Sequence, residues 1–355
     1  MNKVLSIKLL PTVEQSESLK KTTDLFIAVC NFLSEQAFEH QKFNKVVLHR
    51  QCYYQCREKF QNFSSQLIVR AIGVVCDSYR KRQDKQTSFS SSMAVYDARI
   101  LSWTDKEASI WTVDGRLKMP IQVWNQDLFK LPKGESDLIF RNNMWFLQTT
   151  VYLPDVPKQD SSKWLGIDLG VTNLAVTSEG TVYSGENIEK ARVRFADHRT
   201  RLQKRNTPSA RRKVRKVGHK ESRFRKDINH QISKAIVCRA EGTSMGIALE
   251  KLTHINRRTT VRKEQRNRRL SWSFGQLRTF IEYKASEKGI PVRLVSAKNT
   301  SRGCSFCGHI AKENRKSQAD FVCVKCGFSL NADWNAALNI SSRAAVNQPI
   351  VCLNQ

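Results

Sequence analysis

The chain has 355 residues, more than one hydrophobic core usually supports, so we expect two to four domains. Its 60 Lys and Arg against 32 Asp and Glu give a formal net charge of +28, which indicates a polyanionic partner. A membrane is excluded as that partner, because the most apolar stretch, L-I-V-R-A-I-G-V-V-C, is short and contains Arg70.

The cysteines and the N-terminus bear on the cellular compartment. The first residues lack the apolar core of a signal peptide. Outside one motif, the cysteines show no framework spacing and are expected to be reduced; they are Cys30, Cys52, Cys56, Cys76, Cys238 and Cys352. We therefore expect a cytoplasmic protein that is nucleoid-associated when it binds DNA.

The N-terminal half is predicted to begin with a strand and to continue with helices. Residues 3–10 alternate in polarity and end at Pro11, as a strand does. From Thr12 the apolar residues follow a helical period, with a possible N-cap in T-V-E-Q, and a second helical stretch covers residues 64–82. Between residues 89 and 153, short β-rich runs separated by D-G, K-G and Pro indicate the hairpins of a barrel or sandwich.

A polar, Pro-containing segment, P-D-V-P-K-Q-D-S-S-K, is expected to link two domains. The elements predicted after it are a strand to Asp168, a hairpin, a basic helical stretch (190–226), a strand to Glu250, a second basic stretch (251–269), an amphipathic helix (274–288) and a strand (292–296). Carboxylates at strand ends in the order β-hairpin-α-β-α-β favour an RNase H-like α/β fold.

Three acids stand in separate short motifs: Asp168 in W-L-G-I-D-L-G, Glu250 in M-G-I-A-L-E and Asp333 in N-A-D-W-N-A-A. Carboxylates at the ends of buried strands would repel one another unless a cation lay among them. Mg²⁺ prefers carboxylate oxygens, and two ions roughly 3.5–4 Å apart can clamp the attacking and leaving oxygens of a phosphodiester. The alternative for each acid is a turn or helix cap, and for Asp333 an N-cap.

Four cysteines form the pattern C-x₂-C-x₁₅-C-x₂-C: Cys304, Cys307, Cys323 and Cys326. Two such knuckles predict a tetrahedral thiolate cage for one zinc ion, closed and therefore structural. Gly308 and Gly327 follow the second cysteine of each pair, where a tight turn favours glycine. The alternative is a pair of redox dithiols.

The two basic stretches are predicted to contact phosphates. Residues 190–226 hold 16 Lys and Arg but two acids, whereas a solvated helix face mixes both signs. The candidate residues are Arg211, Arg212, Lys213, Arg215, Lys216, Arg257 and Arg258. The aromatic residues among and after them either stack on bases or anchor the helix; they are Phe195, His198, Phe224 and His230.

Several of these stretches together resemble one family. They are S-W-S-F-G-Q-L-R-T-F-I-E-Y-K-A, G-I-P-V, C-S-F-C-G-H, N-R-K-S-Q-A-D-F-V-C-V-K-C-G and N-A-D-W-N-A-A-L-N-I. In these the chain resembles the TnpB proteins of bacterial insertion sequences, compact relatives of type V CRISPR effectors. The likeness is specific over residues 166–340 and weak over 12–153. Two departures are Asn299, where members often have Tyr, and Trp334, which is bulkier than expected after Asp333.

The resemblance implies a multi-domain α+β fold. The implied parts are an oligonucleotide-binding-type β-barrel (1–12 and 85–158), a helical recognition insert (13–84), a RuvC-type, RNase H-like nuclease domain (159–300 and 331–355) and an inserted zinc ribbon (301–330). In such proteins the three acids of the nuclease stand where Asp168, Glu250 and Asp333 stand here, and all three are present.

The function that the resemblance implies is RNA-guided, Mg²⁺-dependent cleavage of double-stranded DNA next to a short flanking motif, by a protein of a transposable element. The expected cofactors are guide RNA, two Mg²⁺ ions and one structural zinc ion, and the expected partners are guide RNA and target DNA. The alternatives are a nuclease-silent, RNA-guided DNA-binding regulator and a DDE-type transposase.

Recognition of the flanking motif is expected in the N-terminal half, because a guided nuclease needs protein contacts to a short duplex before unwinding. The candidates are Arg50, Gln51, Tyr53, Tyr54 and Arg57, for which plain helix surface is the alternative.

Overall fold

The chain forms two compact units, residues 1–154 and 155–355. The computed structural model describes residues 2–80, 82–90, 92–251, 274–317 and 319–346. The boundary between the units falls inside the segment expected to be a linker, and each unit has its own sheet.

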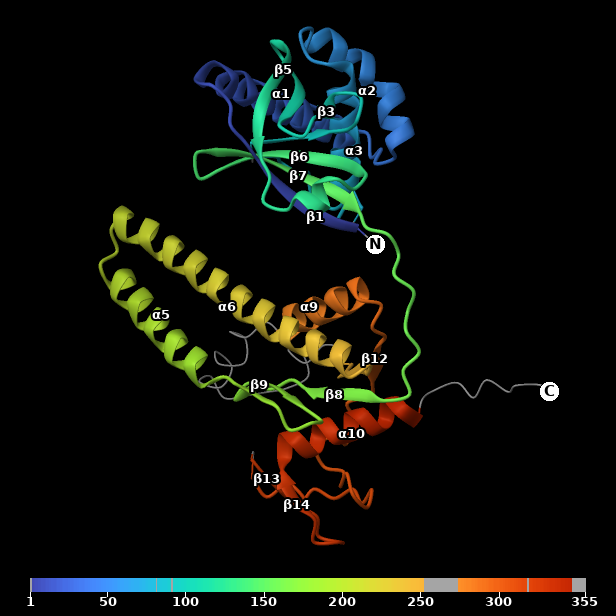
Figure 1. Ribbon diagram of the computed structural model, residues 1–355. Coiled ribbons are helices and arrows are strands. Elements are labelled where there is room, and N and C mark those ends of the chain that lie inside the picture. Colours follow the sequence, from blue (N-terminus) through green and yellow to red (C-terminus); the bar gives the residue numbers. More distant parts are fainter. Residues whose placement is uncertain (1, 81, 91, 252–273, 318, 347–355) are drawn as a thin grey trace, which may run out of the picture. The chain divides into compact units, whose positions relative to one another are not determined.

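The first unit is built on a seven-stranded antiparallel sheet with the order β2-β6-β7-β1-β5-β4-β3 (Figure 1). Its strands are β1 (Asn2–Leu9), β2 (Met93–Tyr96), β3 (Leu101–Trp103), β4 (Glu107–Thr112), β5 (Gly115–Gln122), β6 (Lys133–Arg141) and β7 (Met144–Tyr152). The two edge strands, β2 and β3, follow each other in the chain through a turn in which Leu101 donates its amide to Asp97. This turn brings the edges together, so the sheet is nearly closed.

Three helices lie between β1 and β2: α1 (Val13–Glu39), α2 (Lys45–Lys59) and α3 (Ser65–Tyr79); a short α4 (Gln126–Phe129) follows β5. The expected N-cap of α1 is confirmed, because Thr12 and Gln15 form a capping box. The apolar sides of α1 and α3 join one core with the sheet, through residues such as Phe26, Ile72 and Leu147.

The second unit contains a five-stranded mixed sheet with the order β10-β9-β8-β11-β12. Its strands are β8 (Trp164–Asp168), β9 (Asn173–Thr177), β10 (Val182–Ser184), β11 (Gly246–Glu250) and β12 (Val292–Val295). Strands β8, β11 and β12 are parallel, whereas β9 and β10 form the expected antiparallel hairpin.

Helices cover both faces of this sheet, as the continuous burial along β8, β9 and β11 requires. The helices are α5 (Glu186–Lys204), α6 (Pro208–Gly242), α9 (Phe274–Glu287) and α10 (Ala332–Val346). Ile167 and Leu249 pack with α6 and α9 on one face, and Ala248 packs with Ile340 of α10 on the other. Figure 1 shows α10 under β8, with α6 and α9 on the opposite side.

Three elements differ from the sequence-based expectations. The basic stretch predicted as one helix over residues 190–226 forms two, because Asn206 adopts a positive φ of 44° and Thr207 then caps α6, with Pro208 in its first turn. Helix α2 was not predicted from the apolar period, although the helical insert that the resemblance implies covers it and Asn44 caps it. Strand β5 was missed too, since it contains Pro120, a residue that usually argues against a strand.

Among the residues described, no helix combines the length and the apolar character needed to cross a bilayer.

Candidate active site and metal centre

Two of the three predicted acids lie side by side because their strands do. Asp168 is the last residue of β8 and Glu250 the last of β11, and these neighbouring strands run parallel with Ile167 opposite Leu249. The carboxyl ends of parallel strands share one edge of the sheet. Gly170 allows the tight turn that follows Asp168, because a Cβ there would lie 2.6 Å from the carbonyl oxygen of Asn173.

The third acid, Asp333, lies in the first turn of α10. The N-cap interaction that was its alternative explanation is made by Asn331, whose Oδ1 accepts from the amides of Asp333 and Trp334 at 3.0 and 3.2 Å. The carboxylate of Asp333 instead accepts from Nδ2 of Asn173 at 2.9 Å and lies 3.5 Å from a guanidinium nitrogen of Arg315.

Close packing holds α10 against the sheet. Gly166, in the middle of β8, has no room for a side chain, because a Cβ would lie 2.1 Å from the carbonyl oxygen of Ala337. Trp334 donates from Nε1 to the carbonyl of Ser178 at 3.0 Å and packs on Gly180, which has a positive φ of 84°. The bulky residue after Asp333 therefore fixes the start of α10 on the β9–β10 hairpin.

The electrostatics show that the three carboxylates meet. Burial, followed by the charges of Glu250 and Asp333, raises the pKa of Asp168 to about 7, although Arg315 and the Leu169 amide act against this. Burial also raises the pKa of Glu250, opposed by the hydroxyl of Thr300, which donates to its Oε1, and by Arg343. Desolvation, together with the charges of the other two acids, thus keeps the pKa of Asp168 near neutral pH.

This arrangement suits a divalent cation. Burial and the charges of the other two acids raise the pKa of Asp168, and a bound cation would offset both effects. Carboxylate oxygens are also the ligands that Mg²⁺ prefers. Among the described residues, only the four cysteines form a group whose ligand atoms all lie within 4.8 Å of one another. The carboxylate oxygens of the three acids therefore lie farther apart than the ligand atoms of the cysteine cluster.

The four cysteines form the compact cluster that the sequence predicted. Sγ of Cys304 lies 3.8 Å from that of Cys326, and Sγ of Cys307 lies 3.6 Å from that of Cys323. A tetrahedron with Zn–S bonds of about 2.3 Å has edges of about 3.8 Å, so these thiols fit one zinc ion. Gly308 and Gly327 both have positive φ, 73° and 72°, as the tight knuckles require.

The knuckles are tied directly to the candidate active site. Asn335 of α10 donates to the carbonyl of Gly303 at 2.8 Å and accepts from the amide of Ser305 at 3.0 Å. The strands β13 (Asp320–Val322) and β14 (Ser329–Asn331) of the same module lead straight into α10. The zinc module therefore positions both Asp333 and Arg315.

Sequence reasoning missed three polar residues that contact the acids: Asn173, Thr300 and Arg315. Arg315 stands in the stretch N-R-K-S-Q-A-D-F-V-C-V-K-C-G, and nothing in the spacing of the three residues points to the acids. Asn299 stands where members of the resembled family often have Tyr. It adopts a positive φ of 62°, a conformation that Asn tolerates better than most residues.

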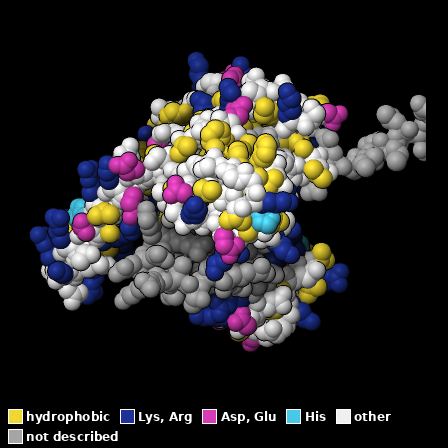
Figure 2. Space-filling view, turned by 90° about the horizontal axis from the view of Figure 1, so that it is seen from below, with side chains coloured by type: hydrophobic (Ala, Val, Ile, Leu, Met, Phe, Trp, Pro, Cys, Tyr) yellow, Lys and Arg dark blue, Asp and Glu magenta, His cyan; other side chains and the backbone are white. Residues whose placement is uncertain are grey.

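The basic candidates in α6 are all exposed: Arg211, Arg212, Lys213, Arg215 and Lys216. Figure 2 shows Lys and Arg side chains gathered over the α5–α6 hairpin, at the left of the view. Three of the four aromatic candidates contact other rings of the protein, since the rings of Phe195 and Phe224 lie 6.2 Å apart and His230 stacks on Phe280 at 4.0 Å. Arg257 and Arg258 lie outside the described residues.

Comparison with known proteins agrees with the resemblance seen in the sequence. Residues 148–266 match the family described as "Probable transposase" (OrfB_IS605), and residues 274–340 match the "Cas12f1-like, TNB domain". The chain is a relative of the TnpB-like and Cas12f proteins.

Three curated relatives illustrate the extent of the similarity. The CRISPR-associated endodeoxyribonuclease Cas12f1 of Sulfoacidibacillus thermotolerans is 34% identical over 57% of this chain and 50% of its own. The putative RNA-guided DNA endonuclease InsQ of Escherichia coli is 31% identical over 52% and 50%. The TnpB-like protein MJ0751 of Methanocaldococcus jannaschii is 32% identical over 48% and 62%. The chain thus spans about half the length of the first relatives it matches.

Proposed function

We propose that this protein is an RNA-guided, metal-dependent DNA endonuclease encoded by a transposable element, which cleaves target DNA next to a short flanking motif. The observation that carries the proposal is the meeting of Asp168, Glu250 and Asp333 at one edge of the second sheet, where burial and the charges of the other two acids hold the pKa of Asp168 near 7. Relatives named as endodeoxyribonucleases and RNA-guided DNA endonucleases support it.

In the proposed mechanism the three acids would hold two Mg²⁺ ions, which would supply Lewis-acid activation of water and offset charge on the departing oxygen. Asn173 and Arg315 orient the carboxylate of Asp333, and Thr300 orients that of Glu250. Asp168 must be ionised to act as a ligand, so a pH near its pKa or above favours the loaded site. The guanidinium of Arg315 also places a positive charge at the site for the scissile phosphate.

The same proposal assigns a role to each of the two units. The second unit acts as a RuvC-type, RNase H-like nuclease with an inserted zinc ribbon, in which zinc is structural. The first unit acts as a barrel with a helical recognition insert, and α2 offers Arg50, Gln51, Tyr53, Tyr54 and Arg57 to the flanking motif. Tyr54 is 78% exposed, which suits such a contact, whereas Arg57 already donates to the carbonyl of Phe63.

The basic surface of α6 holds guide RNA and target DNA through phosphates, while base pairing with the guide selects the sequence. Such a nuclease works on chromosomal DNA in the cytoplasm. The relatives named as nucleases favour this function over a nuclease-silent regulator or a DDE-type transposase.

The test begins with the RNA that copurifies with the protein. After that RNA is sequenced, its guide segment is replaced by a chosen sequence, and a plasmid library carries the matching target beside randomised flanks. We expect linear plasmid with Mg²⁺, none with EDTA, and one enriched flank. Binding without cleavage would support the regulator, and joined DNA ends would support the transposase.

A further inference from the structure

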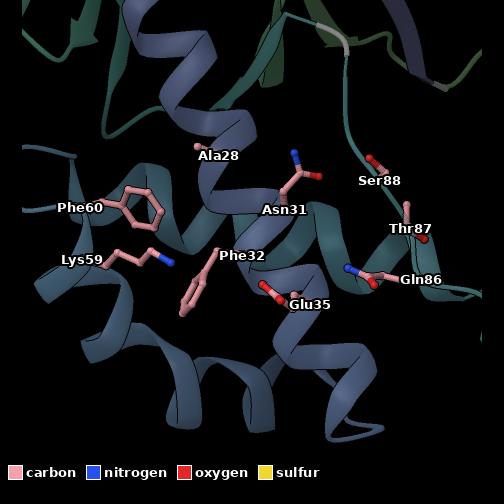
Figure 3. Close-up of a pocket in the computed structure, with 9 residues that line it drawn as sticks. All are labelled: Ala28, Asn31, Phe32, Glu35, Lys59, Phe60, Gln86, Thr87 and Ser88. Atoms are coloured by element: carbon pink, nitrogen blue, oxygen red, sulfur yellow. The ribbon is translucent and has the colours of Figure 1, made fainter.

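A groove in the first unit lies apart from every residue assigned above. It has a volume of about 460 Å³, within the range of small-ligand sites. The exposed face of α1 forms the bottom of the groove. The end of α2 with Phe60 lines one side, and the segment 86–88 lines the other. Figure 3 shows side chains from all three converging on it.

The segment opposite α2 is held in place by partly buried hydrogen bonds. Asn31 both donates to and accepts from the backbone of Phe89, at 3.0 and 2.8 Å. Ser34 donates to the carbonyl of Thr87 at 2.6 Å, and the Thr87 amide donates to the hydroxyl of Tyr79 at 3.1 Å. The groove is therefore preformed, which lowers the entropic cost of filling it.

One side of the groove offers an aromatic surface with a cation beside it. Phe32 and Phe60 meet edge to face with their centroids 6.1 Å apart, and neither ring is fully buried. The ammonium of Lys59 lies over the ring of Phe32, 4.3 Å from its centroid. Lys59 is exposed, so a nucleobase could take the place of the ammonium on the ring while the ammonium turns to the phosphate of that nucleotide.

The polar groups of the groove limit which base it accepts. Figure 3 shows the ring of Phe32 between Lys59 and Glu35, with Gln86 reaching toward α1 from the facing segment. The carboxylate of Glu35 only accepts hydrogen bonds, so it favours a base edge with two adjacent donors. Guanine has such an edge in N1–H and N2–H₂, and the amide of Gln86 can donate to its O6 or N7.

We propose that this groove binds an unpaired guanine nucleotide, stacked on Phe32 and held at its donor edge by Glu35. This proposal rests on the proposed function in one respect: the guanine belongs to the guide RNA or target DNA that the protein binds. Holding one nucleotide out of the stack would fix the register of that strand on the helical part of the first unit.

The first experiment measures binding of GMP, AMP, CMP and UMP to the full chain by saturation-transfer NMR. We expect GMP to bind most tightly. Phe32→Leu keeps the apolar volume but removes the stacking surface, and should weaken GMP binding by about 5- to 150-fold. Glu35→Gln should remove the preference for GMP. The matched control is Glu39→Gln, an exposed acid of α1 outside the groove, which should bind as wild type. Thermal melting verifies that each variant is folded.

Equal binding of the four nucleotides, or folded Phe32→Leu protein that binds GMP as tightly as wild type, would overturn the proposal. These readouts need no cleavage, so they are independent of whether the protein is a nuclease. The source of the guanine is found by crosslinking with 6-thioguanine placed in the copurified RNA or in target DNA. Crosslinks from the RNA or from the DNA to peptides containing Phe32 or Lys59 would support the site and identify which strand supplies the guanine. The absence of such crosslinks with both nucleic acids would contradict the proposal.

Discussion

At the scale of single residues, the candidate site combines charge repulsion with a few polar contacts that relieve it. Asp168 is buried beside two other acids, and Arg315 offsets part of the repulsion. The positions of Asp168 and Glu250 at strand ends could be predicted because carboxylates that close apolar runs have a recognisable context. Asn173, Thr300 and Arg315 could not, because their roles depend on how loops distant in sequence fold back onto the acids.

The raised pKa of Asp168 predicts how metal binding depends on pH. In metal-free protein the folded state keeps the proton up to about pH 7, whereas the unfolded state releases it near 3.8, so this group lowers stability as the pH rises between these values. Mg²⁺ competes with that proton, so we expect Mg²⁺ to raise the melting temperature more at pH 8 than at pH 6. The check is a melting series with and without Mg²⁺, with Asp168→Asn as the control that removes the difference. An equal effect at both pH values would show that Asp168 is not a ligand.

At the scale of elements, the candidate site depends on how closely α10 approaches β8. Most strands and helices of the second unit could be predicted from their periodicity, as for β8, β11, α9 and the β9–β10 hairpin. The helix break at Asn206 was missed because the composition stays basic on both sides of it, although Thr207 and Pro208 mark a helix start. Helix α2 was missed because its apolar residues do not form a clear stripe.

Glycine substitutions test the close approach of α10. Gly166→Ala would place a Cβ 2.1 Å from the carbonyl oxygen of Ala337, so α10 must shift, and we expect a loss of about 1–3 kcal/mol in the free energy of unfolding. Gly218→Ala is the matched control, because its Cβ would meet nothing within 4 Å in the middle of α6. It should stabilise by roughly 0.5–1 kcal/mol. Denaturant unfolding measures both, and a Gly166→Ala variant as stable as wild type would disprove the close packing.

The zinc module is the second element on which the acids depend. Cys307→Ser removes one ligand of the cage, so bound zinc should fall from one equivalent to almost none, and cleavage should fall as Arg315 and the start of α10 lose their support. Elemental analysis and a cleavage assay measure these two effects. Cys238→Ser, at an exposed cysteine of α6, should keep both zinc and activity. Freshly purified, reduced wild type without zinc would refute the assignment.

At the scale of the whole molecule, the net charge of +28 is the feature that composition alone predicts best. It points to a polyanion, yet it gives neither the guide nor the flanking motif, because phosphate contacts carry no sequence information. The division into two units was predictable from the linker composition. The groove of the first unit was not, since Phe32, Glu35, Lys59 and Gln86 share no motif and meet only in the fold.

The basic surface of α6 predicts a steep dependence of nucleic-acid binding on salt. Replacing Arg211, Arg212, Lys213, Arg215 and Lys216 together with Gln should lower affinity for unrelated sequences about equally. It should also flatten the slope of log affinity against log salt by about 0.9 for every duplex phosphate that the variant no longer neutralises. Titrations at several salt concentrations measure this slope. A variant that binds one sequence poorly but keeps its affinity for the others would show that the cluster contacts bases.

The central claim is that Asp168, Glu250 and Asp333 form a cleavage site separate from the nucleic-acid-binding surface. The most direct measurement compares guide-programmed plasmid cleavage and DNA binding for Asp168→Asn, Glu250→Gln and Asp333→Asn, with Glu313→Gln, an exposed acid of the zinc module, as the control. Each of the three should cut at least about 100-fold more slowly with Mg²⁺ while binding RNA and DNA as wild type does, and the control should cut normally. Near wild-type cleavage by any of the three would contradict the claim.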